Sequence, residues 1–69
     1  MIGTIVPAGQ SAGRWLFVTR VDEANGVVYG RVWSAARERW TKHAVWYARN
    51  SIFRATPRCP KPRRPDANP

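Results

Sequence analysis

The chain has 69 residues, of which 12 are Lys or Arg and four are Asp or Glu, so its formal net charge at pH 7 is +8. A chain of this length buries only about 60% of the surface that its unfolded form exposes, which leaves room for one domain and excludes a second. With one cysteine and one histidine, the chain cannot form an intrachain disulfide or a zinc site of its own, and no apolar run approaches the roughly 18 residues of a membrane span.

The first 56 residues contain β-branched and aromatic runs separated by turn residues, a pattern typical of an all-β domain. We expect a first strand at residues 2–6, which ends in a loop rich in glycine. Two longer strands are expected at residues 14–21 and 27–33. The Asn25-Gly26 pair between them is the strongest hairpin signal in the chain.

The register of this hairpin decides which side chains share a face. An odd-numbered loop with Gly26 in a left-handed bulge gives one face that holds Trp15, Phe17, Thr19, Val21, Val27, Tyr29, Arg31 and Trp33. The opposite face then holds the smaller apolar residues Leu16, Val18, Val28 and Val32. Gly30, opposite Val18, marks a bend or a close backbone approach. A two-residue Asn-Gly turn would mix the two sets, and this alternative stays open.

The second half of the body predicts shorter elements. Residues 34–39 are too few for a stable helix and predict a loop or a single turn. A strand at residues 40–47, a tight turn at 48–51 and a short strand at 52–55 complete the pattern. Five short strands in so small a body indicate a closed barrel, because closure removes exposed sheet edges.

Three runs carry a resemblance to a known superfold: residues 15–21 (WLFVTRV), 26–32 (GVVYGRV) and 46–54 (WYARNSIFR). Together they resemble the SH3-like small barrels in their Tudor, chromo-barrel and KOW-like variants. The likeness is architectural and includes no family-specific motif, and an OB-like barrel is the competing fold. It implies a five-stranded SH3-like barrel over residues 1–56, and it implies no activity, because such folds host many functions.

Residues 57–69 differ from the body, because they contain five prolines, four basic residues, one acid and no large apolar side chain. We expect a flexible, disordered tail with extended polyproline II conformations. Its basic residues are predicted to add mobile contacts to a polyanion. They are Arg58, Lys61, Arg63 and Arg64.

The body remains cationic without the tail, since eight basic and three acidic residues are left. Such an excess attracts polyanions, and arginine suits both phosphate binding and stacking on bases. We therefore expect a nucleic-acid-binding protein that contacts phosphates with little sequence specificity, with double-stranded DNA preferred to RNA. The predicted contact residues are Arg14, Arg20, Arg31, Arg37, Arg39, Lys42, Arg49, Arg54, Trp33 and Trp40.

Two structural interpretations compete with this function. Rings in so small a domain usually form its core, so we expect aromatic packing inside the barrel. Scattered arginines are often no more than a solvated surface. The excess of charge favours function, because self-repulsion destabilises a compact body.

Other kinds of partner are compatible with the same composition. The chain could be a small interaction module encoded by a phage or mobile element, an inhibitor or adaptor that docks on an acidic protein surface. An aromatic cage for methylated lysine could use Trp33, Trp40 and Tyr47, but acids are scarce. Residues 54–60 loosely fit a proline-rich peptide ligand, although a linker is the preferred interpretation.

Catalysis, cofactors and metals are not expected. His43 has no second catalytic group at a recognisable spacing, and Cys59 lacks an ordered environment that would activate its thiol. The first seven residues lack a basic leader, and a free thiol suits a reducing compartment, so we expect a soluble cytoplasmic protein.

Overall fold

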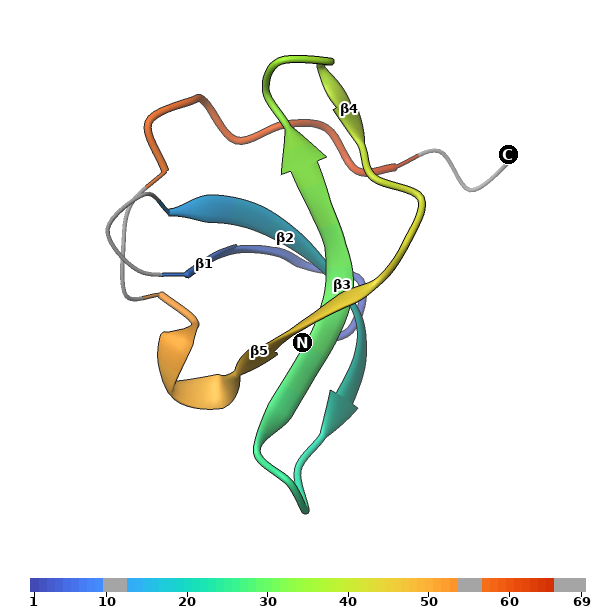
Figure 1. Ribbon diagram of the computed structural model, residues 1–69, viewed down its shortest axis with the longest axis vertical. Helices are drawn as coiled ribbons and strands as arrows, with labels where there is room; N and C mark the ends of the chain where they lie inside the picture. Colours follow the sequence, from blue (N-terminus) through green and yellow to red (C-terminus); the bar gives the residue numbers. More distant parts are fainter. Residues whose placement is uncertain (10–12, 54–56, 66–69) are drawn as a thin grey trace.

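The computed structural model describes residues 1–9, 13–53 and 57–65. It confirms an all-β chain, with five strands in an antiparallel sheet (Figure 1). The elements are β1 (Ile5–Ala8), β2 (Arg14–Asp22), β3 (Val27–Ser34), β4 (Arg39–Trp40), β5 (Val45–Ala48) and a short 3₁₀ helix, η1 (Arg49–Ser51). The first strand begins later than predicted, and an isolated bridge between Ile52 and Ala8 stands where the last strand was expected to start.

The central strand is β3. It pairs with β2 along one edge, and two short strands pair with different parts of its other edge. β4 pairs with Trp33 and Ser34, whereas β5 pairs with residues 27–30. The prediction of one strand at residues 40–47 was wrong, because Thr41 interrupts it. The Thr41 hydroxyl accepts the Val32 N–H at 3.1 Å, and its carbonyl accepts Arg31 Nε at 2.6 Å. Side-chain hydrogen bonds of this kind compete with the regular ladder.

The β2–β3 hairpin has the predicted register over half of its length. The pairs that agree with the prediction are Leu16–Val32, Phe17–Arg31 and Val18–Gly30. The register then shifts between Val18 and Arg20, because Thr19 is an extra residue in a β-bulge. The loop is therefore residues 23–26, with Gly26 at a φ of 65°. As a result Val21 packs against the core, although we expected it on the opposite face.

The core is aliphatic, which corrects the expectation of a core built from rings. Its buried members are Val6, Ala8, Leu16, Val18, Val28, Val32 and Ile52. Leu16, Val18, Val28 and Val32, which the odd-numbered loop grouped on one face, are all buried in this core. Of the aromatic residues, only Trp40 is buried in the described part of the chain. Aliphatic side chains on the inner faces of three strands fill so small an interior, and most rings are left at its margin.

Trp40 links the sheet to the C-terminal segment. Its ring lies 5.4 Å from that of Trp33 and 6.0 Å from that of Phe17, measured between centroids. Its Nε1 donates a hydrogen bond to the carbonyl of Arg63 at 2.8 Å, and Trp15 Nε1 donates to the carbonyl of Cys59 at 2.9 Å. Residues 57–65 therefore contact the domain, and they pass the ends of β3 and β4 in Figure 1. Fast motion of the tail stays a prediction.

The last residue of β2 is a carboxylate whose ionised form supports the β2–β3 turn. Asp22 accepts hydrogen bonds from the Asn25 side chain at 2.8 Å and from its backbone N–H at 3.2 Å. These bonds favour the charged form, and they lower the pKa of Asp22 below its ordinary value of 3.8. A depressed pKa contributes stability above the unfolded-state value, and this contribution is lost as the pH falls through the folded-state value.

We expect the Asp22→Asn variant to lose less stability than the original chain on acidification from about pH 5 to pH 2. The reason is that the introduced amide, unlike the carboxylate, has no proton to gain. Urea denaturation at each pH, followed by circular dichroism, gives the free energy of unfolding. Parallel pH profiles for the two proteins would contradict the role of this carboxylate.

Candidate nucleic-acid interface

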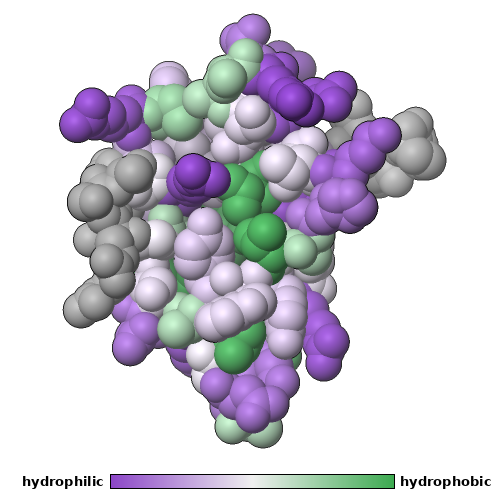
Figure 2. All heavy atoms as spheres, viewed as in Figure 1, coloured by the Kyte–Doolittle hydropathy of each residue, from purple (hydrophilic) through white to green (hydrophobic). Residues whose placement is uncertain are grey.

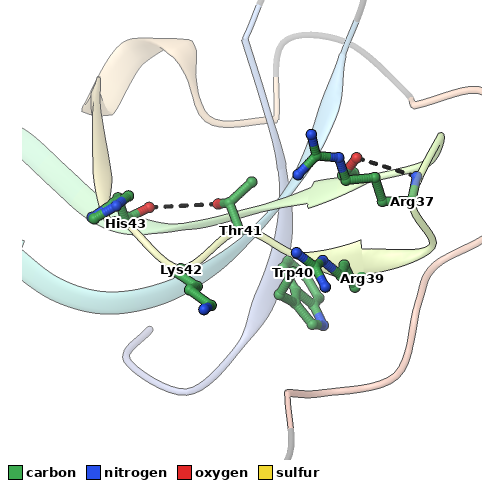
Figure 3. A pocket seen from close by; sticks show the side chains of 7 residues that line it. Arg37, Arg39, Trp40, Thr41, Lys42 and His43 are labelled. Carbon is green, nitrogen blue, oxygen red and sulfur yellow. Dashed lines mark hydrogen bonds between the residues drawn. The ribbon is translucent and has the colours of Figure 1, made fainter.

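Three exposed cations lie in and around β4: Arg37 in the turn that precedes it, Arg39 within it and Lys42 after it. The turn closes with Glu38 at a φ of 52°, and the Ser34 hydroxyl accepts the Arg37 N–H at 3.4 Å. A hollow of about 370 Å³, here called the basic hollow, is lined by Ser34, Arg37, Arg39, Trp40, Thr41, Lys42 and His43. Figure 3 shows Arg37 and Arg39 at one end, His43 at the other and Lys42 between them.

The charges of the basic hollow are available to a ligand. Arg37, Arg39 and Lys42 are exposed, and within the described residues none of them forms an ion pair. No Asp or Glu is among the described residues that line the hollow. In Figure 2, strongly hydrophilic residues lie around most of the rim of the face shown, and pale and green residues fill most of its centre. An anion that enters the hollow therefore meets unopposed positive charge.

A second hollow adjoins the first and is larger, about 880 Å³. We call it the aromatic groove, because its walls include Trp15 of β2, Trp33 of β3, and Trp46 and Tyr47 of β5. Arg14 and Arg58 also line it. Ser34, Thr41 and His43 border both hollows, so the two surfaces are continuous.

The tail extends the same surface. Arg58 lines the aromatic groove, while Lys61 and Arg63 line a further hollow of about 410 Å³ beside Trp33. The guanidinium carbon of Arg64 lies 5.8 Å from the centroid of the Phe17 ring, a cation–π distance. Glu38 lies among the residues of this last hollow and offsets part of its charge.

Three other basic residues of the body, Arg20, Arg31 and Arg49, have partners within the molecule. The guanidinium carbon of Arg20 lies 5.1 Å from the Tyr29 ring centroid, and Arg49 forms an exposed ion pair with Glu23 at 3.4 Å. Arg31 is held by the Thr41 carbonyl. Arg54 lies outside the described residues. These contacts make Arg20, Arg31 and Arg49 less available to a ligand than the cations of the basic hollow.

The two tryptophans predicted as contacts, Trp33 and Trp40, differ in exposure. A third, Trp46, is exposed although the prediction omitted it. Trp40 is buried at 8% exposure, so it lines the basic hollow but offers little ring surface to a base. Trp33 is half-buried and borders the groove. Trp46 is 64% exposed and was not predicted as a contact. No sequence signal identifies it, because its place in the short strand β5 and the exposure of its neighbour Val45 are known only from the structure.

In residues 1–9, 13–53 and 57–65, no three His, Cys, Asp or Glu side chains gather where they could hold a metal ion. The same stretches hold no helix with the length and apolar character to cross a membrane.

No protein-family model, no curated protein and no solved structure matches the chain. The resemblance to small barrels rests on the strand pattern of the chain itself.

Proposed function

We propose that the protein binds nucleic acid through phosphate contacts centred on the basic hollow, with little sequence specificity. The observation that supports this most is a group of three exposed cations that form no ion pair with any described residue, around a hollow whose described lining contains no acid. Phosphate oxygens accept hydrogen bonds from arginine and lysine, and such contacts carry no base information. Double-stranded DNA is the proposed ligand of this hollow.

We further propose that the sheet closes into a small SH3-like barrel. Three backbone contacts support it, since they bring the chain after η1 alongside β1. They are the Ala8–Ile52 bridge, Gly9 N–H to the Ser51 carbonyl at 3.1 Å, and Phe53 N–H to the Pro7 carbonyl at 2.8 Å. Because β5 pairs with β3 on the other side, the chain would run around the core and return to its first strand.

Salt-dependent binding tests the function. We expect a labelled random-sequence duplex to bind less tightly as salt is raised from about 50 to 200 mM, because phosphate contacts release counterions. The Arg37→Gln/Arg39→Gln variant should reduce the slope of log affinity against log salt by about 1.8, or about 0.9 for each lost phosphate contact. Fluorescence anisotropy measures both quantities.

The matched control is the Arg20→Gln/Arg49→Gln variant, which loses the same charge at residues with internal partners. It should keep a salt slope close to that of the original chain. Equal losses in the two variants would show that net charge alone drives binding and would overturn the assignment to the hollow. Absence of salt-sensitive binding to the duplex would overturn the function itself.

A protein partner is the second candidate, and the exposed rings favour it. Trp46 and Phe53 are each 64% exposed, and tryptophan is a frequent centre of protein–protein contacts. An acidic protein surface would also complement the basic hollow. Retention of the chain by such a surface, together with indifference to nucleic acid, would favour this candidate.

A further inference from the structure

We infer that the aromatic groove binds the unpaired bases of single-stranded nucleic acid, and that Trp46 is the main stacking ring. This rests on the proposed nucleic-acid binding and deepens it, because it makes single strands a tighter ligand than duplex. The cations of the groove, Arg14 and Arg58, would hold the phosphates that flank a stacked base.

The exposure of Trp46 is the first observation. Its side chain is 64% accessible, and its neighbour Val45 is 40% accessible, so no described residue covers this edge of the sheet. Trp33 and Tyr47 are half-buried and Trp15 gives its indole N–H to the Cys59 carbonyl. These three rings are therefore fixed in the walls, while Trp46 has accessible surface to offer to a planar partner.

The size of the groove is the second observation. Its volume of about 880 Å³ lies within the range of roughly 300–1,000 Å³ that is typical of pockets for small organic ligands. A nucleoside is a ligand of this class. The basic hollow, at about 370 Å³, is smaller and its described lining has a single aromatic residue, the buried Trp40.

The charge and the aromatic side chains of the groove together indicate its ligand. None of the described residues in the groove is Asp or Glu, and the groove continues into the basic hollow through Ser34, Thr41 and His43. Base-stacking rings beside a positive groove are the combination that binds single-stranded nucleic acid. An acidic peptide would use the charge but not a platform of rings. Bases inside a duplex are already stacked on one another and cannot reach Trp46.

The experiment compares Trp46→Ala with Phe53→Ala. Both wild-type rings are 64% exposed, but Phe53 is outside the groove, so the pair separates stacking in the groove from a general loss of exposed ring. Each variant is titrated into a labelled oligothymidylate of about 20 nucleotides and into a random-sequence duplex. Thermal unfolding shows whether each variant is still folded, and Trp46→Phe provides a conservative replacement.

We expect Trp46→Ala to bind the single strand about 5- to 150-fold more weakly, which corresponds to about 1–3 kcal/mol for one stacked base. Trp46→Phe should recover part of this loss, because it keeps an aromatic face. Phe53→Ala should bind the single strand as the original chain does, and the duplex affinity should change little in any variant.

The outcomes separate the two proposals. If Trp46→Ala and Phe53→Ala bind the single strand equally well while salt-sensitive duplex binding persists, the groove assignment is overturned and the proposed function stands. A loss of single-strand and duplex binding to the same extent in Trp46→Ala would also overturn a site for unpaired bases. If the original chain binds neither nucleic acid, the proposed function fails and the groove assignment fails with it.

Discussion

Replacement of Gly30 by alanine will lower the free energy of unfolding by about 3 kcal/mol, the upper end of the usual cost of overpacking. A Cβ added at Gly30 would overlap the carbonyl oxygen of Phe17 and would lie 2.9 Å from Leu16 Cδ1. The carbonyl cannot move aside without disturbing the Phe17–Arg31 and Val18–Gly30 pairs of the central hairpin. Overpacking in a rigid core costs about 1–3 kcal/mol and sometimes more. That is a large part of the roughly 3–10 kcal/mol expected for a domain of this length.

The control for this prediction is Gly26→Ala. Gly26 has a φ of 65° and no heavy atom within 4 Å of an added Cβ, so alanine there meets backbone strain without a clash. We expect it to cost only about 1–2 kcal/mol. Urea denaturation of both variants, followed by circular dichroism, measures the difference. A Gly30→Ala variant as stable as Gly26→Ala would show that the hairpin relaxes around the new methyl group.

Trp40→Ala will lower the free energy of unfolding by about 3–5 kcal/mol, the usual cost of removing a buried aromatic side chain. The alanine would remove the ring contacts to Phe17 and Trp33 and the hydrogen bond to the Arg63 carbonyl. Trp40→Phe keeps a ring and loses the indole N–H. We expect it to cost about 0.5–1.5 kcal/mol, the net contribution of one hydrogen bond.

Limited proteolysis gives this prediction a second measurement. If the indole of Trp40 holds the tail, trypsin will cleave after Arg63 faster in Trp40→Phe than in the original chain, because the anchored backbone is released. Trp46→Phe is the matched control, since it alters a tryptophan that is 64% exposed. Unchanged cleavage in Trp40→Phe would show that the tail does not depend on this hydrogen bond.

The central hairpin was predictable because its signals are local. Alternation of side chains and the Asn25-Gly26 pair fixed the two strands and half of the register. The bulge was not predictable, because Thr19 and Arg20 are both exposed and neither position has to face the core. Only the packing of Val21 against the core shows which residue had to be extra.

The candidate site was predictable in composition and not in detail. In an unbroken strand over residues 40–47, Trp40 and Trp46 would share a face, because side chains alternate with a period of two. The interruption at Thr41 separates them, so Trp40 is buried and Trp46 is exposed. In the same way, the pairing of Arg49 with Glu23 depends on two segments that meet only in the folded chain.

The tail contacts also join residues that lie far apart in the sequence. Trp15 donates a hydrogen bond to the carbonyl of Cys59, 44 residues later in the sequence, and Trp40 donates one to the carbonyl of Arg63, 23 residues later. Composition alone indicates disorder for residues 57–69, since the segment contains no large apolar side chain to bury. The segment instead contacts the body through its backbone carbonyls, which accept the tryptophan N–H groups. No sequence pattern identifies such contacts.

The bridge between Ala8 and Ile52 has a consequence for the kinetics of folding. The β2–β3 hairpin needs only local closure and belongs to a class of structure that forms in about 1–10 μs. The bridge joins distant positions, so the entropy of closing that long loop must be overcome before β1 gains its second neighbour. Until the bridge forms, one edge of β1 can pair with other chains. Pro7 lies in this strand and has no N–H to donate, so the strand is a poor template for aggregation.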